Sequence, residues 1–78
     1  MIIRKAGYGR QLDVRLARSV GASWSQIGAA LGTSKQAAWE AHTRWIDQQA
    51  AEFDHTGVAG FDPAAEAAAR HRAATPDD

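Results

Sequence analysis

Lys35, Gln36 and Thr43 are the side chains of this sequence best suited to recognising the edges of nucleic-acid bases. A glutamine amide can pair with adenine through one donor and one acceptor, and a lysine ammonium can donate to guanine. A threonine hydroxyl can bond to a base edge or to the nearby backbone. These residues therefore predict contacts in the major groove of double-stranded DNA, provided that one helix presents all three on one face.

Hydroxyl and basic groups near these residues can bind phosphate. Thr33 and Ser34 come directly before Lys35, and at the start of a helix their hydroxyls lie beside backbone amides that also bind anions. Further lysines and arginines are expected to contact phosphate and to set the salt dependence of binding. They are Arg4, Lys5, Arg10, Arg15, Arg18 and Arg44.

Trp39 and Glu40 belong to the same predicted outer face, where both residue types are unusual. Two interpretations of Trp39 stay open: contact with sugar, a thymine methyl or a partner, and packing in a half-buried position. An acidic side chain on a groove-facing surface repels phosphate unless it accepts a hydrogen bond from cytosine N4, so the role of Glu40 is also open. The whole predicted outer face consists of Ser34, Lys35, Gln36, Trp39, Glu40, Thr43 and Arg44.

Two short helices joined by a tight turn would position this face. The first should begin at Trp24, because Ser23 and Gln26 have the spacing of a capping box in which each side chain bonds to the backbone amide of the other. Ala22 and Ile27 can close over that cap as a hydrophobic staple. The local pattern thus predicts both the start of the helix and the direction in which the chain enters it.

The turn between the two helices depends on glycine. Gly32 stands where the first helix must end in a left-handed residue, which costs a residue with a Cβ roughly 1 kcal/mol or more. Gly28, one turn earlier, permits a neighbouring backbone to come close. Thr33 or Ser34 can cap the second helix, and Thr33 with Gln36 has the spacing of a second capping box.

The second helix is predicted to run to about Phe53, with an inward stripe of Ala38, Ala41 or His42, and Trp45. Trp24 is expected to pack over a preceding helix at residues 11–20.

That preceding helix has apolar residues four apart at Leu12, Leu16 and Val20, with Ala17 beside them, and they predict its inward stripe. Its water-facing residues should then be Asp13, Arg15 and Arg18. Gly21 is expected to end it.

Residues 21–45 resemble the short helix-turn-helix proteins and domains of high-GC bacteria, in which the pattern S-W-x-x-I-G-x-A-L-G-x-S-x-Q-A-A recurs. The resemblance covers about a third of the chain. It implies a three-helix unit, similar to sigma region four or to a homeodomain, whose last helix enters the major groove. The expected function is sequence-specific DNA binding by a transcriptional regulator of bacterial or phage origin.

Two other functions fit the same three helices. One is a protein-interaction module that binds RNA polymerase, a sigma factor or a phage protein through Trp39 and the acidic C-terminal part. The other is a nonspecific architectural DNA-binding protein, which would depend on salt but prefer no sequence.

The N-terminal residues extend the predicted three-helix unit. Residues 1–10, with a basic cluster, two glycines and Tyr8, suit an arm that follows a minor groove or the DNA backbone, so the DNA-binding domain is predicted to span residues 1–53. Such a segment equally suits a frayed terminus. Its first three apolar residues would also suit an edge strand or a dimer contact.

Residues 54–62 contain two glycines and no helical period, which indicates a linker. Asp62 as a cap and Pro63 as a first residue then start an alanine-rich helix at 63–74, a docking or dimerisation element that lacks a large apolar stripe. Phe53, Val58 and Phe61 are the predicted anchors of the linker: they either dock on the helix bundle and order the linker, or offer an apolar contact to another chain. Residues 75–78 are expected to be disordered.

Charge is separated along the sequence although the whole chain has a net charge of zero. Residues 1–45 carry seven basic and two acidic groups, and residues 46–78 carry two basic and seven acidic groups. A basic half can attract phosphate because salt screens the acidic half beyond about 10 Å at 0.1 M. Local charge therefore supports nucleic-acid binding.

Length and composition narrow the remaining classes of protein to which this chain could belong. A chain of 78 residues buries only about 60% of its unfolded surface, which makes a homodimer a reasonable assembly. No cysteine is present, the apolar runs are too short for a membrane, and we expect a cytoplasmic protein associated with the nucleoid. The histidines at 42, 55 and 71 lack metal-ligand spacing, and no catalytic grouping can be assembled, so we expect no metal, no cofactor and no enzyme activity.

Overall fold

The computed structural model describes residues 7–78, with side chains from Arg10 onward. Four helices account for most of these residues: α1 (Gly7–Ser19), α2 (Trp24–Leu31), α3 (Lys35–Thr56) and α4 (Pro63–Ala73). The described residues contain no strand, which confirms the predicted all-α fold with a fourth helix. The predicted phosphate contacts Arg4 and Lys5, the apolar residues 1–3 and the side chain of Tyr8 lie outside the described part.

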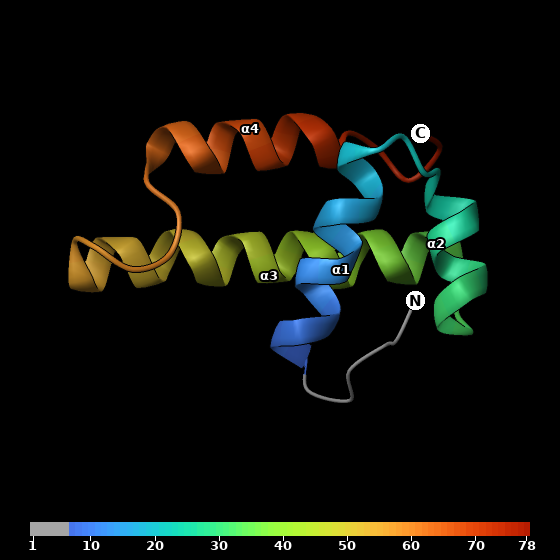
Figure 1. The fold of residues 1–78 in the computed structure, drawn as a ribbon, viewed down its shortest axis with the longest axis horizontal. Coiled ribbons are helices and arrows are strands. Elements are labelled where there is room, and N and C mark those ends of the chain that lie inside the picture. Colours follow the sequence, from blue (N-terminus) through green and yellow to red (C-terminus); the bar gives the residue numbers. More distant parts are fainter. Residues whose placement is uncertain (1–6) are drawn as a thin grey trace.

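The long helix α3 is the base of the fold (Figure 1). α4 runs back along α3, α1 crosses in front of it, and α2 lies at its N-terminal end, close to the C-terminus. Within the described range, no helix is long and apolar enough to cross a membrane.

The start of α2 has the predicted caps. The Ser23 hydroxyl accepts a hydrogen bond from the Gln26 amide at 3.1 Å, and the Gln26 side chain accepts one from the Ser23 amide at 2.8 Å. Ile27 is buried and Ala22 packs against the core, as a hydrophobic staple requires. The predicted start of α2 at Trp24 is therefore confirmed.

The turn from α2 to α3 is the three-residue segment 32–34. Gly32 has the predicted left-handed conformation, with φ of +72°, and ends α2. A Cβ on Gly28 would lie 2.8 Å from the carbonyl oxygen of Thr33 and 2.9 Å from the carbonyl carbon of Ser34. Because both neighbours are backbone atoms, only glycine allows α2 to lie this close to the start of α3.

The predicted capping box at the start of α3 does not form. Ser34 alone caps the helix, accepting a hydrogen bond from the Ala37 amide at 3.0 Å. The Gln36 amide bonds instead to the Glu40 carboxylate at 3.0 Å. α3 also continues three residues beyond Phe53, where Gly57 ends it in the left-handed conformation.

The core joins all four helices around aromatic residues. The predicted inward positions Ala38, His42 and Trp45 are buried, and the sequence analysis missed Ile46, which is fully buried together with Trp24. The complete set of buried apolar residues is Val14, Trp24, Ile27, Ala38, Trp45, Ile46, Phe61, Ala69 and Ala73.

The predicted inward face of α1 is wrong except at Ala17, which is partly buried and packs against the core. Leu12, Leu16 and Val20 are 41%, 62% and 76% exposed, whereas Gln11 and Val14 are buried. The face that turns inward carries polar groups with partners inside the fold, and the Gln11 side chain bonds to His42 across the helix pair. An apolar stripe alone therefore misidentified the buried face.

The segment between α3 and α4 is an ordered strap. Phe61 is buried, its ring stands edge-on to Trp45 with centroids 5.3 Å apart, and its amide donates to the Gln49 carbonyl at 2.9 Å. Phe53 is partly buried. Val58, the third predicted anchor, is 89% exposed, so that prediction is wrong.

α4 docks through small residues, as an alanine-rich helix must. Ala69 and Ala73 are buried against the rest of the core. Asp62 caps the helix, accepting from the Ala65 amide at 2.8 Å. At the other end, the Trp24 indole donates to the Ala73 carbonyl at 2.8 Å, in a buried hydrogen bond. α4 is thus tied to the first residue of α2.

Residues 75–78, which we expected to be disordered, form a hydrogen-bonded turn. The Asp78 amide donates to the Thr75 carbonyl at 3.0 Å, and the Thr75 hydroxyl donates to the Asp78 carboxylate at 2.8 Å. This turn brings acidic residues back toward the start of α3, where Asp77 lies beside Lys35.

His42 is a neutral histidine enclosed by aromatic rings. Its Nδ1 lies 2.8 Å from the Gln11 side-chain oxygen, and its ring centroid lies 5.5 Å from that of Trp24 and 5.4 Å from that of Trp45. Burial, together with the positive charges of Arg18 and Arg15, lowers the pKa of His42 from 6.5 to about 4. Protonation of this imidazole is therefore much easier in the unfolded chain than in the folded one.

We predict that this histidine makes the protein acid-sensitive. Between pH 6.5 and 4 the unfolded chain binds a proton at His42 that the folded protein does not, so the free energy of unfolding falls as the pH falls, by up to about 3 kcal/mol. Urea titrations across this range should show a flatter pH dependence for His42→Gln than for the parent. His71→Gln, a change at an exposed histidine, should keep the parental slope. Equal slopes for all three proteins would contradict the prediction.

Candidate nucleic-acid interface

The first turn of α3 and the turn before it present polar groups at the surface. Thr33, Ser34, Lys35 and Gln36 are all exposed. Because Gly28 lies against this turn and its carbonyl accepts a hydrogen bond from the Thr33 amide at 2.8 Å, the four residues lie on a corner that is packed against α2. The first-turn amides of α3 point outward along the helix axis at the same place, as at any helix N-terminus.

Further along α3, the predicted outer face is only partly exposed. Glu40 and Arg44 are exposed, whereas Trp39 and Thr43 are partly buried. Trp39 packs against the edge of the core, and its indole donates to the Ala74 carbonyl at 3.1 Å. Of the two interpretations left open for Trp39, half-buried packing describes its position in the free protein.

Glu40 organises its neighbours. Its carboxylate accepts one N–H of the Gln36 amide at 3.0 Å, and its main-chain carbonyl accepts the Thr43 hydroxyl at 2.9 Å. A glutamine amide has two N–H donors and one acceptor oxygen, so Gln36 keeps one of each for another partner. The acidic residue that was difficult to explain from sequence therefore orients a residue expected to read bases.

Arg10 and Arg44 come together from two helices. They line a shallow surface cleft of about 300 Å³ together with Gln11, Trp45, Gln48 and Gln49. The Arg10 guanidinium also donates to the Leu31 carbonyl at the end of α2, at 3.3 Å. Two predicted phosphate contacts are thus neighbours although they are far apart in the sequence.

We predicted that Arg18 would face water, but its side chain turns into the fold. Its guanidinium donates to the carbonyl oxygens of Ala22 at 2.8 Å, of Arg72 at 2.6 and 2.9 Å, and of Asp78 at 3.2 Å. Its central carbon lies 5.0 Å from the centroid of the Trp24 ring. Arg18 therefore ties α1 to the end of α4.

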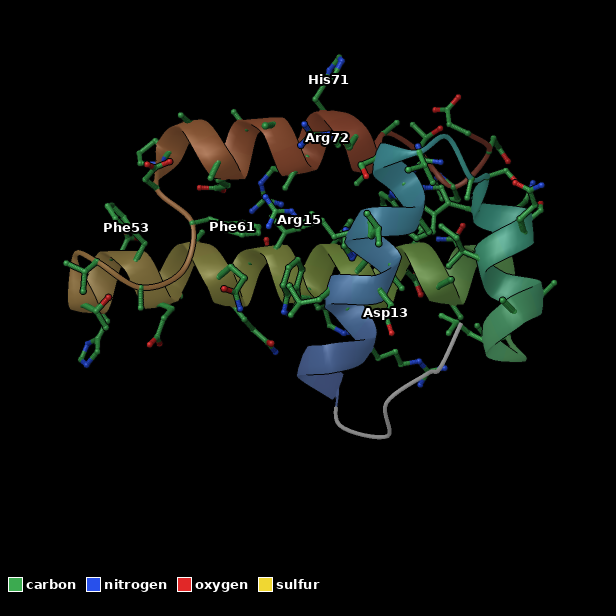
Figure 2. All side chains as sticks on the ribbon, in the orientation of Figure 1. Asp13, Arg15, Phe53, Phe61, His71 and Arg72 are labelled. Carbon is green, nitrogen blue, oxygen red and sulfur yellow. The ribbon has the colours of Figure 1, made fainter. Side chains whose placement is uncertain are left out.

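Arg15 also turns inward, contrary to the prediction. Its guanidinium lies over the Phe61 ring, 4.9 Å from the ring centroid. Figure 2 shows both side chains in the space between α1, α3 and α4. The structure gives Arg15 and Arg18 packing roles and does not place them on the corner at the start of α3. Asp13, the third residue expected in water, is partly buried.

The C-terminal segment is also part of this region, which we did not predict from the sequence. Asp77 forms an ion pair with Lys35, with 2.9 Å between the carboxylate and the ammonium, and the Ala74 carbonyl bonds to Trp39. The acidic character of the last residues was a visible signal. Their location over α3 was not, because only the docking of α4 directs the chain there.

Comparison of the chain with protein-family models, with curated proteins and with solved structures finds no match to any of them.

We predict that Arg18 acts mainly through its planar, forked guanidinium. Arg18→Lys keeps the charge but loses most of the bonds to three carbonyl groups, so the free energy of unfolding should fall by roughly 1–3 kcal/mol. Arg44→Lys, the same change at an exposed site, should stay within about 0.5 kcal/mol of the parent. Urea unfolding measures both. Equal stabilities for the two variants would show that Arg18 has no special structural role.

Proposed function

We propose that this protein binds double-stranded DNA sequence-specifically, as a transcriptional regulator of the bacterial or phage helix-turn-helix type, with the start of α3 in the major groove. The observation that carries the proposal is the corner at residues 32–34. There the Gly28 backbone contact sets α2 against α3, and the exposed residues that follow have the chemistry to bind phosphate and base edges.

The packing of α4 limits which part of α3 can enter a groove. The ion pair between Arg70 and Asp47, at 2.6 Å, and the bond from the strap to Gln49 hold α4 and the strap along one side of the C-terminal half of α3. We take residues 35–44 as the part available to DNA, and at 1.5 Å per residue they span about 15 Å. That length suits a major groove about 12 Å wide.

Each residue of the available part has a proposed role. Gln36, held by Glu40, would pair with adenine through its second N–H and its oxygen, and Lys35 would donate to guanine or to a nearby phosphate. Thr33 and Ser34 would bind phosphate beside the helix amides. Thr43 would contact the adjacent backbone, and the Arg10–Arg44 cleft would hold a phosphate further along the strand.

A direct test is fluorescence anisotropy with labelled duplexes at two salt concentrations. A preferred duplex, selected from random sequence, should bind more tightly than unselected duplex, and both affinities should fall with salt. Binding without sequence preference would favour the architectural alternative. A lack of binding even in dilute buffer would exclude DNA as the partner.

We predict that two variants separate base reading from phosphate binding. Gln36→Ala should lower the preference at one base-pair position by about 1–3 kcal/mol and leave unselected duplex bound as before. Arg44→Ala should weaken binding to all sequences alike and reduce the salt slope by about one. The same anisotropy titrations measure both effects. Identical changes in the two variants would remove the assignment of roles.

An exposed apolar stripe runs along α1 and one residue beyond its end, formed by Leu12, Leu16 and Val20, and it favours protein binding as a second candidate function. The three side chains are four residues apart and therefore share one face. Water-exposed apolar stripes of this kind are typical of helix–helix association. The simplest partner is a second copy of the chain, and a protein of the transcription machinery is the alternative.

We predict that Leu16→Glu lowers self-association, because a carboxylate at the centre of the stripe cannot be buried without a large desolvation cost. Sedimentation equilibrium should show a shift toward monomer for this variant. Ala51→Glu adds the same charge to an exposed position on a different helix, α3, and should leave the association unchanged. A parent protein that is monomeric at high concentration would rule out the homodimer.

A further inference from the structure

The chain changes direction abruptly where α4 ends. Ala74 has φ of +51° and ψ of −126°, and it is the one residue other than glycine with positive φ among those that the structure describes. This conformation resembles the first central position of a type II′ turn, where glycine is the usual residue. An alanine there is strained. After this residue the chain turns back toward α2, as Figure 1 shows, and Asp77 reaches Lys35 at the start of α3.

The returning segment occupies groups that the proposed function needs. Asp77 pairs with Lys35, and the Ala74 carbonyl holds the Trp39 indole. A carboxylate on a lysine ammonium resembles the contact that a DNA phosphate would make. The segment thus lies on the part of α3 that would approach the groove.

The attachment of the segment is weak, whereas the attachment of α4 is firm. The Lys35 and Asp77 side chains are 47% and 84% exposed, and exposed pairs of this kind shift an equilibrium by only a few-fold. The two other bonds that hold the segment, from Trp39 to the Ala74 carbonyl and from Arg18 to the Asp78 carbonyl, are exposed as well. In contrast, the Trp24 bond to Ala73 is buried. Residues 74–78 can therefore leave the surface while α4 stays in place, and departure relieves the strain at Ala74.

We propose that residues 74–78 are an autoinhibitory latch that competes with DNA for the start of α3. In the closed state, which is the arrangement described above, residues 74–78 lie on α3. Asp77 then neutralises the charge of Lys35, and the chain covers Trp39. A DNA phosphate displaces Asp77, and the segment swings away about Ala74. This inference rests on the proposed function and adds regulation to it, because any partner that captures the segment would increase the affinity for DNA.

The latch can be observed without DNA through the reactivity of Lys35. The chain has two lysines, Lys5 and Lys35, so partial acetylation followed by peptide mass spectrometry reports Lys35 relative to Lys5. Asp77→Asn should increase the relative labelling of Lys35 by about two- to five-fold, because the ion pair is lost. Asp54→Asn removes the same charge from an exposed residue near the far end of α3 and should leave the labelling unchanged.

The same variants should change DNA affinity in parallel. Asp77→Asn should tighten binding of the full chain to duplex by about two- to five-fold more than Asp54→Asn does, and should steepen the salt dependence. Ala74→Gly keeps the charge and relieves the strain in the closed state, so it should slow Lys35 labelling and weaken duplex binding by up to about five-fold.

The outcomes separate the latch from the proposed function. Duplex binding by the parent, with equal affinities for Asp77→Asn and Asp54→Asn, would overturn the latch and leave the proposed function intact. Opposite effects of Asp77→Asn and Ala74→Gly on both readouts would support the latch. If no variant binds duplex, the proposed function and the latch both fail, even if Lys35 labelling changes.

Discussion

The close contact between Gly28 and the backbone at residues 33 and 34 is the constraint on which the rest of this structure depends. It sets α2 against the start of α3, and the buried Trp24 at the other end of α2 then reaches the last turn of α4. The position of α4 in turn decides which side of α3 is covered and where the C-terminal segment goes. One missing Cβ therefore influences both the exposed corner and the segment lying on it.

Local features of the fold were predictable because they depend on residues within a few positions of one another. The Ser23 capping box, the left-handed Gly32 and the Asp62 cap all formed as predicted. The orientation of α1 was not predictable in this way, because Gln11 finds its partner 31 residues away and Arg18 finds one 54 residues away. Polar residues with distant partners look like surface residues in a sequence pattern.

The same distinction applies to the candidate interface. The exposed positions at the start of α3 followed from helical spacing, and the sequence identified them. The bond from Gln36 to Glu40 is also local, yet helical spacing did not indicate that an acidic neighbour would orient an amide. The cover over Lys35 and Trp39 depends on the path of the chain after α4, which only the folded structure contains.

The buried hydrogen bond between Trp24 and Ala73 also limits how this helical unit can be transplanted. A graft that stops at Phe53 would leave the Trp24 indole without its acceptor and would strip Phe61 from the face of Trp45. The graft would therefore expose an aromatic surface that is prone to nonspecific association in any host protein. The portable module therefore extends through Ala73, and the predicted boundary at residue 53 cuts through its interior.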